Sequence, residues 1–386
     1  MGFEAPTDHK FATPWQLQHQ QMARAAWRYF EQQYQPATGL INSVAGYTKT
    51  TLWDVASAIA GTVAAKQIGL LSLPQMEARL RPLLATLASW PLYREWLPNR
   101  SYHTDSGLPV VRRHEVGANG SGWSVLDIAR TLGWLVIVAR RYPQLQPQVE
   151  AIRHYWRTDL LVAKGQLQGA RWERNGERRY QEGRLGYEQY AAVALALWGQ
   201  AAPVALKPHR DERHWLAGVA LLKDNRPRPF FTSDPYYLAQ LEFGVAAAPM
   251  QAEIHAIWQA HQRHYQQHQR LYCYGEDAIA WPPWFVYNNV HYHGTAWHST
   301  DHQGRATTEQ QDLSAKCAVA WAVLSHGSYS KALWQVLEKL YGQHGWYSGI
   351  MRDGRINRSQ NLNTNGIILT ALAYLHGGKR SLLPTP

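Results

Sequence analysis

Two kinds of helical pattern alternate along the chain. In the first kind, apolar residues recur every three or four positions, as in an amphipathic helix with one face in water. In the second kind, almost every position is apolar, which indicates a helix that is buried on most sides. The amphipathic segments are 15–34, 74–89, 145–157, 212–222, 250–268 and 329–342, and the apolar segments are 54–69, 123–139, 187–199, 236–247, 313–325 and 361–375.

The joins between these segments alternate in length as well. Four of the apolar segments, 54–69, 123–139, 236–247 and 313–325, are followed by a join of a few residues, as at Leu70 to Leu73, and short joins make neighbouring helices antiparallel. Each amphipathic segment is followed by a longer join, as at 90–122 and 269–312. The pattern predicts an all-α fold, an (α/α)6 toroid of six helical hairpins, with the long loops at the mouth where the inner helices begin. An open α-solenoid is the alternative, but its loops would be more uniform in length.

We expect residues 1–386 to form a single toroid domain with its core over about 15–376, because no linker interrupts the pattern. A hydrophobic content of 45% supports a large core. The chain has no uninterrupted run of about 18 apolar residues, so we expect no transmembrane segment. Residues 1–11 lack the pattern of a signal peptide. The expected location is periplasmic or otherwise exported if a signal peptide was removed, and cytoplasmic if the start is native.

Charge and cysteine usage narrow the partners. The net charge is +11, but the basic residues are scattered and form no recognised nucleic-acid motif, so we expect no nucleic-acid partner. Cys273 and Cys317 do not make a disulfide framework. His291 and His293 form an H-x-H pair that lacks a third ligand of fixed geometry, so we expect no metal and no cofactor. Nothing in the pattern indicates an oligomeric state.

Aromatic residues point to a carbohydrate ligand. The chain has 18 Trp and 21 Tyr but only 7 Phe, and Trp and Tyr combine a flat apolar face with a hydrogen-bonding edge. Some of them fill the core, but others fall in loops. Together with polar loop residues, the expected substrate-binding set is Trp53, Trp123, Tyr187, Tyr236, Trp284, Asn288, Asn289, His291, His293, Trp297, Trp346, Asp353 and Asn363. The loop stretches LYCYGED and WFVYNN have the composition of short strands.

Carboxylates stand at several inner-helix starts. Asp54, Asp127, Glu188 and Asp312 lie in or just before a first turn, where a carboxylate often serves only as a helix cap. A toroid gathers these starts in one place, and glycoside hydrolysis needs two carboxylic groups there. We predict Glu188 as the general acid and Asp127 as the base or as the residue that orients water. Asp54, Glu309 and Asp312 are further candidates for a catalytic or substrate-orienting role.

Four ordered segments carry a family resemblance over roughly residues 15–376. They read TTLWDVASAIAGTVAAKQIGLLS, GWSVLDIARTLGWLVIVARRYP, LGYEQYAAVALALWG and NLNTNGIILTALAYL. They resemble the bacterial domain-of-unknown-function family 3131, which in turn is similar to glucoamylase-like (α/α)6 proteins such as β-1,2-glucanases. The resemblance implies a catalytic acid at Glu188 and an active-site aspartate at Asp127. The relatives continue the glutamate helix into a Ser-Pro-Thr-His turn, whereas this chain reads Gly-Gln-Ala-Ala-Pro.

These features predict a glycoside hydrolase that acts on a bacterial or envelope polysaccharide, with β-glucans among the candidate substrates. Two alternatives stay open. One is a non-catalytic glycan-binding or scaffolding protein of a polysaccharide pathway. The other is a polysaccharide lyase, in which Tyr187 or a histidine acts as base and the positive net charge attracts an acidic polymer.

Overall fold

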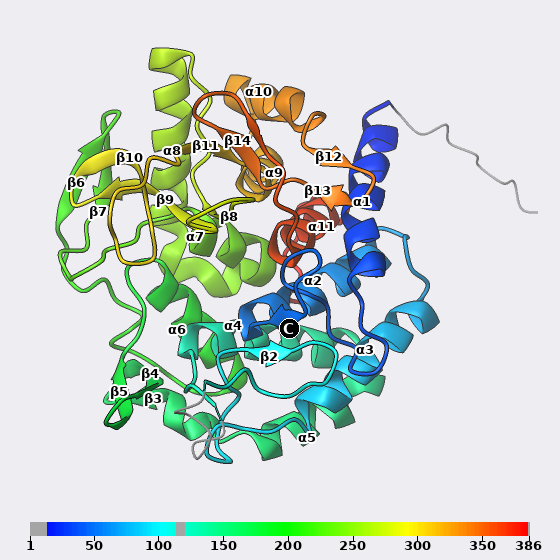
Figure 1. Cartoon of the computed structure of the whole chain (residues 1–386). Coiled ribbons are helices and arrows are strands. Elements are labelled where there is room, and N and C mark those ends of the chain that lie inside the picture. Colours follow the sequence, from blue (N-terminus) through cyan, green and yellow to red (C-terminus); the bar gives the residue numbers. More distant parts are fainter. Residues whose placement is uncertain (1–13, 113–119, 385–386) are drawn as a thin grey trace, which may run out of the picture.

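The apolar helices form the inner ring of the structure, which is a computed structural model that describes residues 14–112 and 120–384. The inner helices are α2 (Leu52–Gln67), α4 (Val125–Arg141), α6 (Tyr187–Trp198), α7 (Asp234–Leu238) with its continuation η4 (Ala239–Phe243), α9 (Ala315–Leu324) and α11 (Leu362–His376). Each contacts the next in chain order, and α11 contacts α2, which closes the ring (Figure 1). The structure is therefore mainly helical, as the alternating joins predict.

Small residues let the inner helices approach one another closely. In α2, the run from Val55 to Ala65 is buried throughout, and most of its side chains are no larger than threonine. Gly366 of α11 faces this run, and a Cβ atom there would lie 2.7 Å from the carbonyl oxygen of Ser57. The closure of the ring between α11 and α2 thus depends on a position without a side chain.

The amphipathic helices lie outside this ring. In α3, Leu80, Leu83, Leu84 and Leu87 form one buried face, as the three-to-four spacing predicts. Ser72 and Gln75 cap its start reciprocally. The outer helices are α1 (Pro14–Gln32), α3 (Leu73–Leu87), α5 (Gln146–Tyr155), α8 (Gln251–His268) and α10 (Ser328–Leu337).

The predicted outer helix at 212–222 is wrong. This segment is a hairpin of β6 (Arg213–Leu216) and β7 (Val219–Leu222), with Leu216 paired to Val219. Ala217 and Gly218 both have positive φ, 49° and 74°, which is the geometry of a two-residue hairpin turn and excludes a helix. The predicted helical hairpin of 187–199 and 212–222 therefore has a β-hairpin in place of its outer helix.

The predicted inner helix at 236–247 is also interrupted. It begins as α7, widens into the π-turns of η4, and ends in the 3-10 turns of η5 (Gly244–Met250). Gly244 has φ 54°, a conformation that ends a regular helix.

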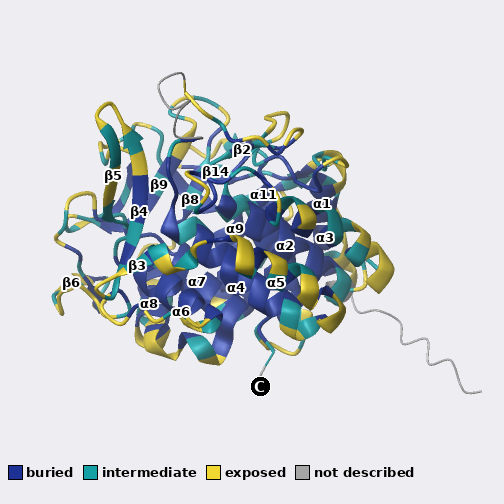
Figure 2. Cartoon of the chain, turned by 90° about the horizontal axis from the view of Figure 1, so that it is seen from below, coloured by how far each residue is buried: buried dark blue, intermediate teal, exposed yellow. Residues whose placement is uncertain are grey.

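Small sheets gather over one end of the ring, so the expectation of an all-α chain needs correction. As predicted, both strand-like stretches contribute strands: LYCYGED leads into β8 (Glu276–Ala278), and WFVYNN lies largely in β9 (Phe285–Tyr292). In Figure 2, β2, β5, β9 and β14 lie on one side of the inner helices, and the chain end marked C lies on the other. The strands at this end and in the loops around it are β1 (Lys49–Thr50), β2 (Tyr102–His103), β3 (Val162–Ala163), β4 (Gln166–Glu173), β5 (Gly176–Gln181), β8 (Glu276–Ala278), β9 (Phe285–Tyr292), β10 (Thr295–Thr300), β11 (Gln311–Ser314), β12 (Tyr341–Gly342), β13 (Gly345–Trp346), β14 (Gly349–Met351) and β15 (Ile356–Asn357).

The main hydrophobic core runs through this architecture from Met22 to Leu383. The largest sheets are three-stranded and antiparallel, with the orders β10-β9-β8, β3-β4-β5 and β11-β14-β15. In the part of the chain that the structure describes, no helix combines the length and the apolar character that crossing a bilayer demands. Residues 1–11, on which the prediction about export rests, lie outside the described residues.

Candidate active site

A cavity of about 940 Å³ opens where the inner helices begin. Its walls come from the starts of α2, α4, α6, α7 and α11 and from loop strands that include β4, β5, β8 and β9. This volume is typical of a site for a small molecule or a few sugar units. Six carboxylates line it, namely Asp54, Asp127, Glu173, Glu182, Asp234 and Glu276.

Asp54 and Asp127 occupy the same position in two neighbouring inner helices. Each is the third residue of its helix, and the N-cap side chain, Thr51 or Ser124, accepts a hydrogen bond from its backbone N–H. The carboxylates in turn accept hydrogen bonds from hydroxyl groups, at 2.9 Å from Thr51 Oγ1 to Asp54 and at 3.0 Å from Ser124 Oγ to Asp127. Capping thus fixes both side chains at the cavity wall.

The surroundings of Asp127 favour its protonated form. Burial is the main cause and the negative charge of Glu182 is the second, and together they raise the pKa of Asp127 to about 7. Arg100 opposes this shift, but its guanidinium is already paired with Glu182 at 3.3 Å. A carboxyl group with a pKa near 7 can accept or donate a proton at neutral pH.

Glu276 of β8 provides a second carboxyl group of this kind. Burial and then the charge of Asp234 raise the pKa of Glu276 to about 8. Its Oε1 accepts a hydrogen bond from Thr232 Oγ1 at 3.0 Å, and the Tyr187 hydroxyl also hydrogen-bonds to it. Glu276 is therefore mostly protonated at neutral pH, which suits a general acid.

A buried lysine organises the residues behind Glu276. Lys316 of α9 is fully buried and lies 2.9 Å from Asp234 Oδ1 and 3.2 Å from Asp277 Oδ1. Its ammonium also donates to the backbone carbonyl of Glu276. Asp234 Oδ2 accepts a hydrogen bond from the backbone N–H of Glu276 at 2.9 Å. These contacts hold β8 against α7 and α9, so that the Glu276 carboxyl has a defined place on the wall.

Arg130 of α4 supports the floor of the cavity. Its guanidinium pairs with the buried Glu242 at 2.9 Å and stacks against the ring of Trp53 at 4.5 Å. It also donates to Asn363 Oδ1 at 3.3 Å, and Trp53 Nε1 donates to the same oxygen at 3.2 Å. Trp53 and Asn363, both predicted as substrate-binding, line the cavity, and so does Tyr187.

Glu188, the predicted general acid, lies outside the cavity lining. It is 2% exposed, and its two oxygens are bonded to Arg226, at 2.9 Å for Oε1 and 2.5 Å for Oε2. Gln181 Nε2 donates to the same Oε1 at 2.7 Å. Arg226 in turn pairs with Asp224. This network gives both oxygens of Glu188 a partner within the protein.

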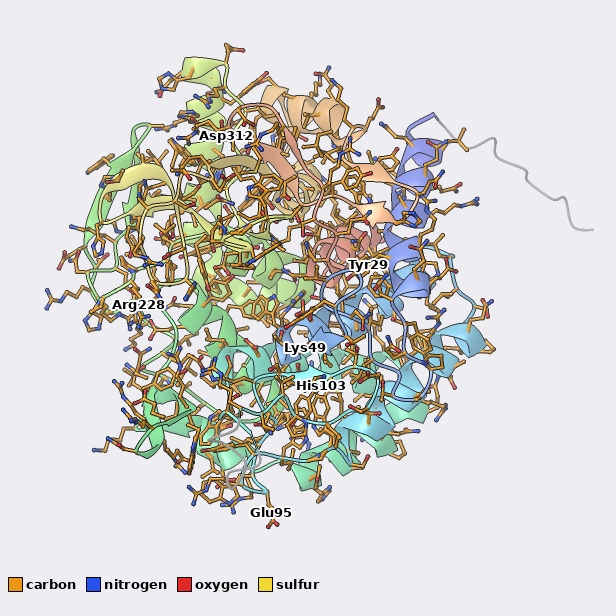
Figure 3. All side chains as sticks on the ribbon, in the orientation of Figure 1. Tyr29, Lys49, Glu95, His103, Arg228 and Asp312 are labelled. Atoms are coloured by element: carbon orange, nitrogen blue, oxygen red, sulfur yellow. The ribbon has the colours of Figure 1, made fainter. Side chains whose placement is uncertain are left out.

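Asp312 and Glu309 are also absent from the lining. Asp312 lies in β11 and pairs with Arg270 at 2.5 Å and with Arg352 at 3.0 Å. Figure 3 shows it far above Lys49, a cavity residue. Glu309 accepts a hydrogen bond from Trp281 Nε1 at 2.7 Å. Both carboxylates organise loops.

The other predicted binding residues lie outside the cavity lining. Trp123 and Trp346 are fully buried, and each indole N–H donates to a backbone carbonyl. Asn288 and Asn289 are buried: Asn288 donates to the Gly275 carbonyl and accepts from Ser299 Oγ, and Asn289 donates to the His298 carbonyl. The predicted residues outside the lining are Trp123, Tyr236, Trp284, Asn288, Asn289, His291, His293, Trp297, Trp346 and Asp353. Among residues 14–112 and 120–384, no group of three His, Cys, Asp or Glu side chains is arranged to hold a metal ion.

Most of the cavity lining was missed, including the loop residues Glu182, Glu276, Phe230 and Tyr287. They lie in or near strands of the long loops, where helical periodicity carries no information. The one available signal was GED at 275–277, a pair of acidic residues inside a strand-like stretch.

Nearly the whole chain matches the model of one protein family, which decides the family. The chain belongs to the family described as Protein of unknown function (DUF3131). The match covers residues 21–378. No curated protein matches the chain in sequence.

Solved structures share the fold of this family member at low sequence identity. An endo-β-1,2-glucanase from Chitinophaga pinensis, in complex with sophorotriose and glucose, is 13% identical with a TM-score of 0.69, over 95% of this chain and 94% of that one. A β-1,2-glucanase from Parabacteroides distasonis is 12% identical with a TM-score of 0.67, over 95% and 57% of the two chains. A cellobiose 2-epimerase from Bacillus thermoamylovorans is 10% identical with a TM-score of 0.54, over 93% and 100%. These matches establish the (α/α)6 type of fold, which hosts more than one reaction on sugars.

Proposed function

We propose that this DUF3131 protein is a glycoside hydrolase that cleaves a β-linked glucan, with β-1,2-glucan as the first candidate substrate. One observation carries the proposal: the carboxyl groups of Asp127 and Glu276 line the same cavity and have raised pKa values, as does that of Asp54. Hydrolysis of a glycosidic bond needs such a pair, one protonated and one ionised. The fold of the β-1,2-glucanases supports the choice of substrate.

The pKa values of Glu276 and Asp127 suggest which of them is the general acid and which is the base. With a pKa of about 8, Glu276 is the group that keeps its proton at neutral pH and donates it to the leaving oxygen. With a pKa of about 7, Asp127 is ionised in about half of the molecules at pH 7 and activates the attacking water. Trp53 and Tyr187, in edge-to-face contact at 5.5 Å, offer apolar surface to a sugar ring.

The test is release of reducing ends from β-1,2-glucan by the purified chain. We expect activity in the wild type and a loss of at least about 100-fold in Glu276→Gln, because the amide has no acidic proton to give. Glu309→Gln is the matched control, since that glutamate also lies in a loop but outside the cavity lining. If the Glu276→Gln variant remained active, Glu276 would not be the general acid. Thermal unfolding of both variants shows whether the fold is kept.

A non-catalytic glycan-binding protein is the second candidate. The ion pairs Arg100–Glu182 and Arg178–Glu173 favour it, because they neutralise two of the cavity carboxylates. Binding of β-1,2-glucan by the wild type without release of reducing ends would support this function instead. The structure gives less support to a polysaccharide lyase. Burial and the charge of Glu276 raise the pKa of Tyr187 well above its usual value, so its hydroxyl stays protonated and cannot readily act as a base.

An envelope polysaccharide as the source of the substrate requires an exported chain. Cell fractionation of the native producer tests this part of the proposal.

A further inference from the structure

The cations that line the cavity differ in their partners. Arg100 and Arg178 pair with the cavity carboxylates Glu182 and Glu173. Three other arginines, Arg171, Arg184 and Arg228, also line the cavity. No carboxylate lies within ion-pair distance of any of these three in the described part of the chain.

Arg184 is the most informative of these arginines. Its guanidinium is partly buried and donates only to neutral oxygens, at 3.0 Å to the Pro227 carbonyl, 3.1 Å to Gln181 Oε1 and 2.6 Å to the Gly183 carbonyl. Burial, and then the positive charge of Arg226, lower the pKa of Arg184; the charges of Asp224 and Glu188 oppose this shift, but both carboxylates are already paired with Arg226. A cation that is desolvated without a counterion favours an anion beside it.

An aromatic wall adjoins these cations. The rings of Phe230 and Tyr287 are stacked with their centroids 4.1 Å apart, and Phe285 meets Tyr287 edge to face at 5.2 Å. All three line the cavity. Burial and the negative charges of Glu276 and Asp127 raise the pKa of Tyr287, while the positive charges of Arg228 and Arg171, which lie within electrostatic range of its hydroxyl, oppose this rise. A flat apolar surface edged by guanidinium groups suits a sugar ring with an anionic substituent.

Arg228 lies at the edge of this wall, on the loop between β7 and α7. Its backbone has φ 55°, a conformation that is costly for a residue with a side chain. It is exposed, it lines the cavity as Lys49 does, and Figure 3 shows the two residues well apart. It is therefore in place to meet a ligand that enters the cavity.

We propose that the wall of Phe230, Tyr287 and Phe285, with Arg184 and Arg228 beside it, binds a glycan unit that carries an anionic substituent, either a carboxylate or a phosphate ester. This inference rests on the proposed function and specifies its substrate as a charged glucan. The neutral backbone of the glucan stacks on the aromatic rings, and the guanidinium groups bind the substituent. Arg171 adds positive charge at the rim.

The test compares three ligands by isothermal titration calorimetry, with the Glu276→Gln chain as background to prevent cleavage. The ligands are sophorotriose, sophorotriose with one succinyl half-ester, and sophorotriose with one phosphate monoester. We expect at least one anionic ligand to bind about tenfold more tightly than sophorotriose at low salt, as one charge-assisted hydrogen bond provides. Tighter binding of only the succinyl or only the phosphate compound identifies the substituent. The preference falls as salt is added.

Two variants show where the preference comes from. We measure the ratio of the Kd of sophorotriose to the Kd of the anionic ligand that binds more tightly. This ratio is expected to fall toward one in Arg228→Gln and in the double variant Arg184→Gln/Arg228→Gln. Arg24→Gln, an exposed change of the same charge on α1, leaves that ratio as it was. Because Arg228 is exposed, its single variant tests the wall even if the double variant folds poorly. Equal Kd values for all three ligands would overturn this inference and leave the proposed function standing. Failure of all three to bind would overturn both.

Discussion

The starts of α4 and α6 both carry a carboxylate, yet only one of them faces the cavity. In α4, Ser124 caps the helix and Asp127 is its third residue. In α6, Gly186 is the N-cap, Gln189 holds the third position, and Glu188 is the second residue. Tyr187, the first residue of α6, takes the place at the cavity wall.

One residue along a helix turns a side chain by about 100°. With Tyr187 on the cavity side, Glu188 is turned toward the loop at 224–226, where Arg226 binds it. The comparison teaches that an acidic residue in a first turn does not define an active-site residue. Its position within the turn, and the cation that the neighbouring loop supplies, decide between chemistry and structure.

The largest expected effect separates the two carboxylates by activity. Asp127→Asn removes the proposed base, and we expect the rate of β-1,2-glucan cleavage to fall about 1000-fold. Glu188→Gln keeps the cavity lining intact, and we expect the rate of the folded protein to stay within about threefold of wild type. Reducing-end assays, normalised to the folded fraction, measure both.

The reverse result would exchange the two roles. If Glu188→Gln abolished cleavage while Asp127→Asn remained active, the ion pair with Arg226 would have to open during catalysis. A structure of the Glu188→Gln variant would then show whether Arg226 moves.

The second effect concerns stability. Arg226→Met removes the shared partner of two buried carboxylates, Glu188 and Asp224. We expect the free energy of unfolding to fall by about 3–5 kcal/mol, because each acid is left uncompensated. Urea unfolding at pH 7 measures the change. Arg157→Met is the control: its partner Asp159 is exposed, and loss of an exposed pair has little effect. Equal stability of the two variants would mean that the network does not hold α6.

The same contrast shows what the sequence could reveal. The inner helices and the common end of their starts followed from apolar spacing and join length, and so did the places of Asp54, Asp127, Trp53 and Asn363. The orientation of Glu188 did not, because it depends on Arg226, which is 38 residues away in a loop without periodicity. Glu276 was out of reach for a similar reason, since only the fold brings β8 beside α7 and α9.

The third effect is a pH profile. Cleavage needs Asp127 ionised and Glu276 protonated. The rate is therefore expected to fall as the pH drops below about 7, where Asp127 takes up a proton, and to fall again above about 8, where Glu276 loses one. Initial rates between pH 5 and 10 give the two limbs. A rate that is highest at pH 5 would contradict the assignment of Asp127 as base.

The smallest expected effect is a shift of the acidic limb of the pH profile, which tests the cause of the raised pKa of Asp127. The negative charge of Glu182 is the second cause of the raised pKa of Asp127. Glu182→Gln removes this charge and frees Arg100, and both changes favour the ionised carboxylate. The acidic limb of the pH profile should therefore move to lower pH, while the basic limb, set by Glu276, stays in place. Glu173→Gln is the matched control, because Glu173 also lines the cavity but is not among the main causes of the raised pKa of Asp127. An acidic limb that moves equally in both variants would show that the limb reports the overall charge of the cavity, and that Asp127 is not its source.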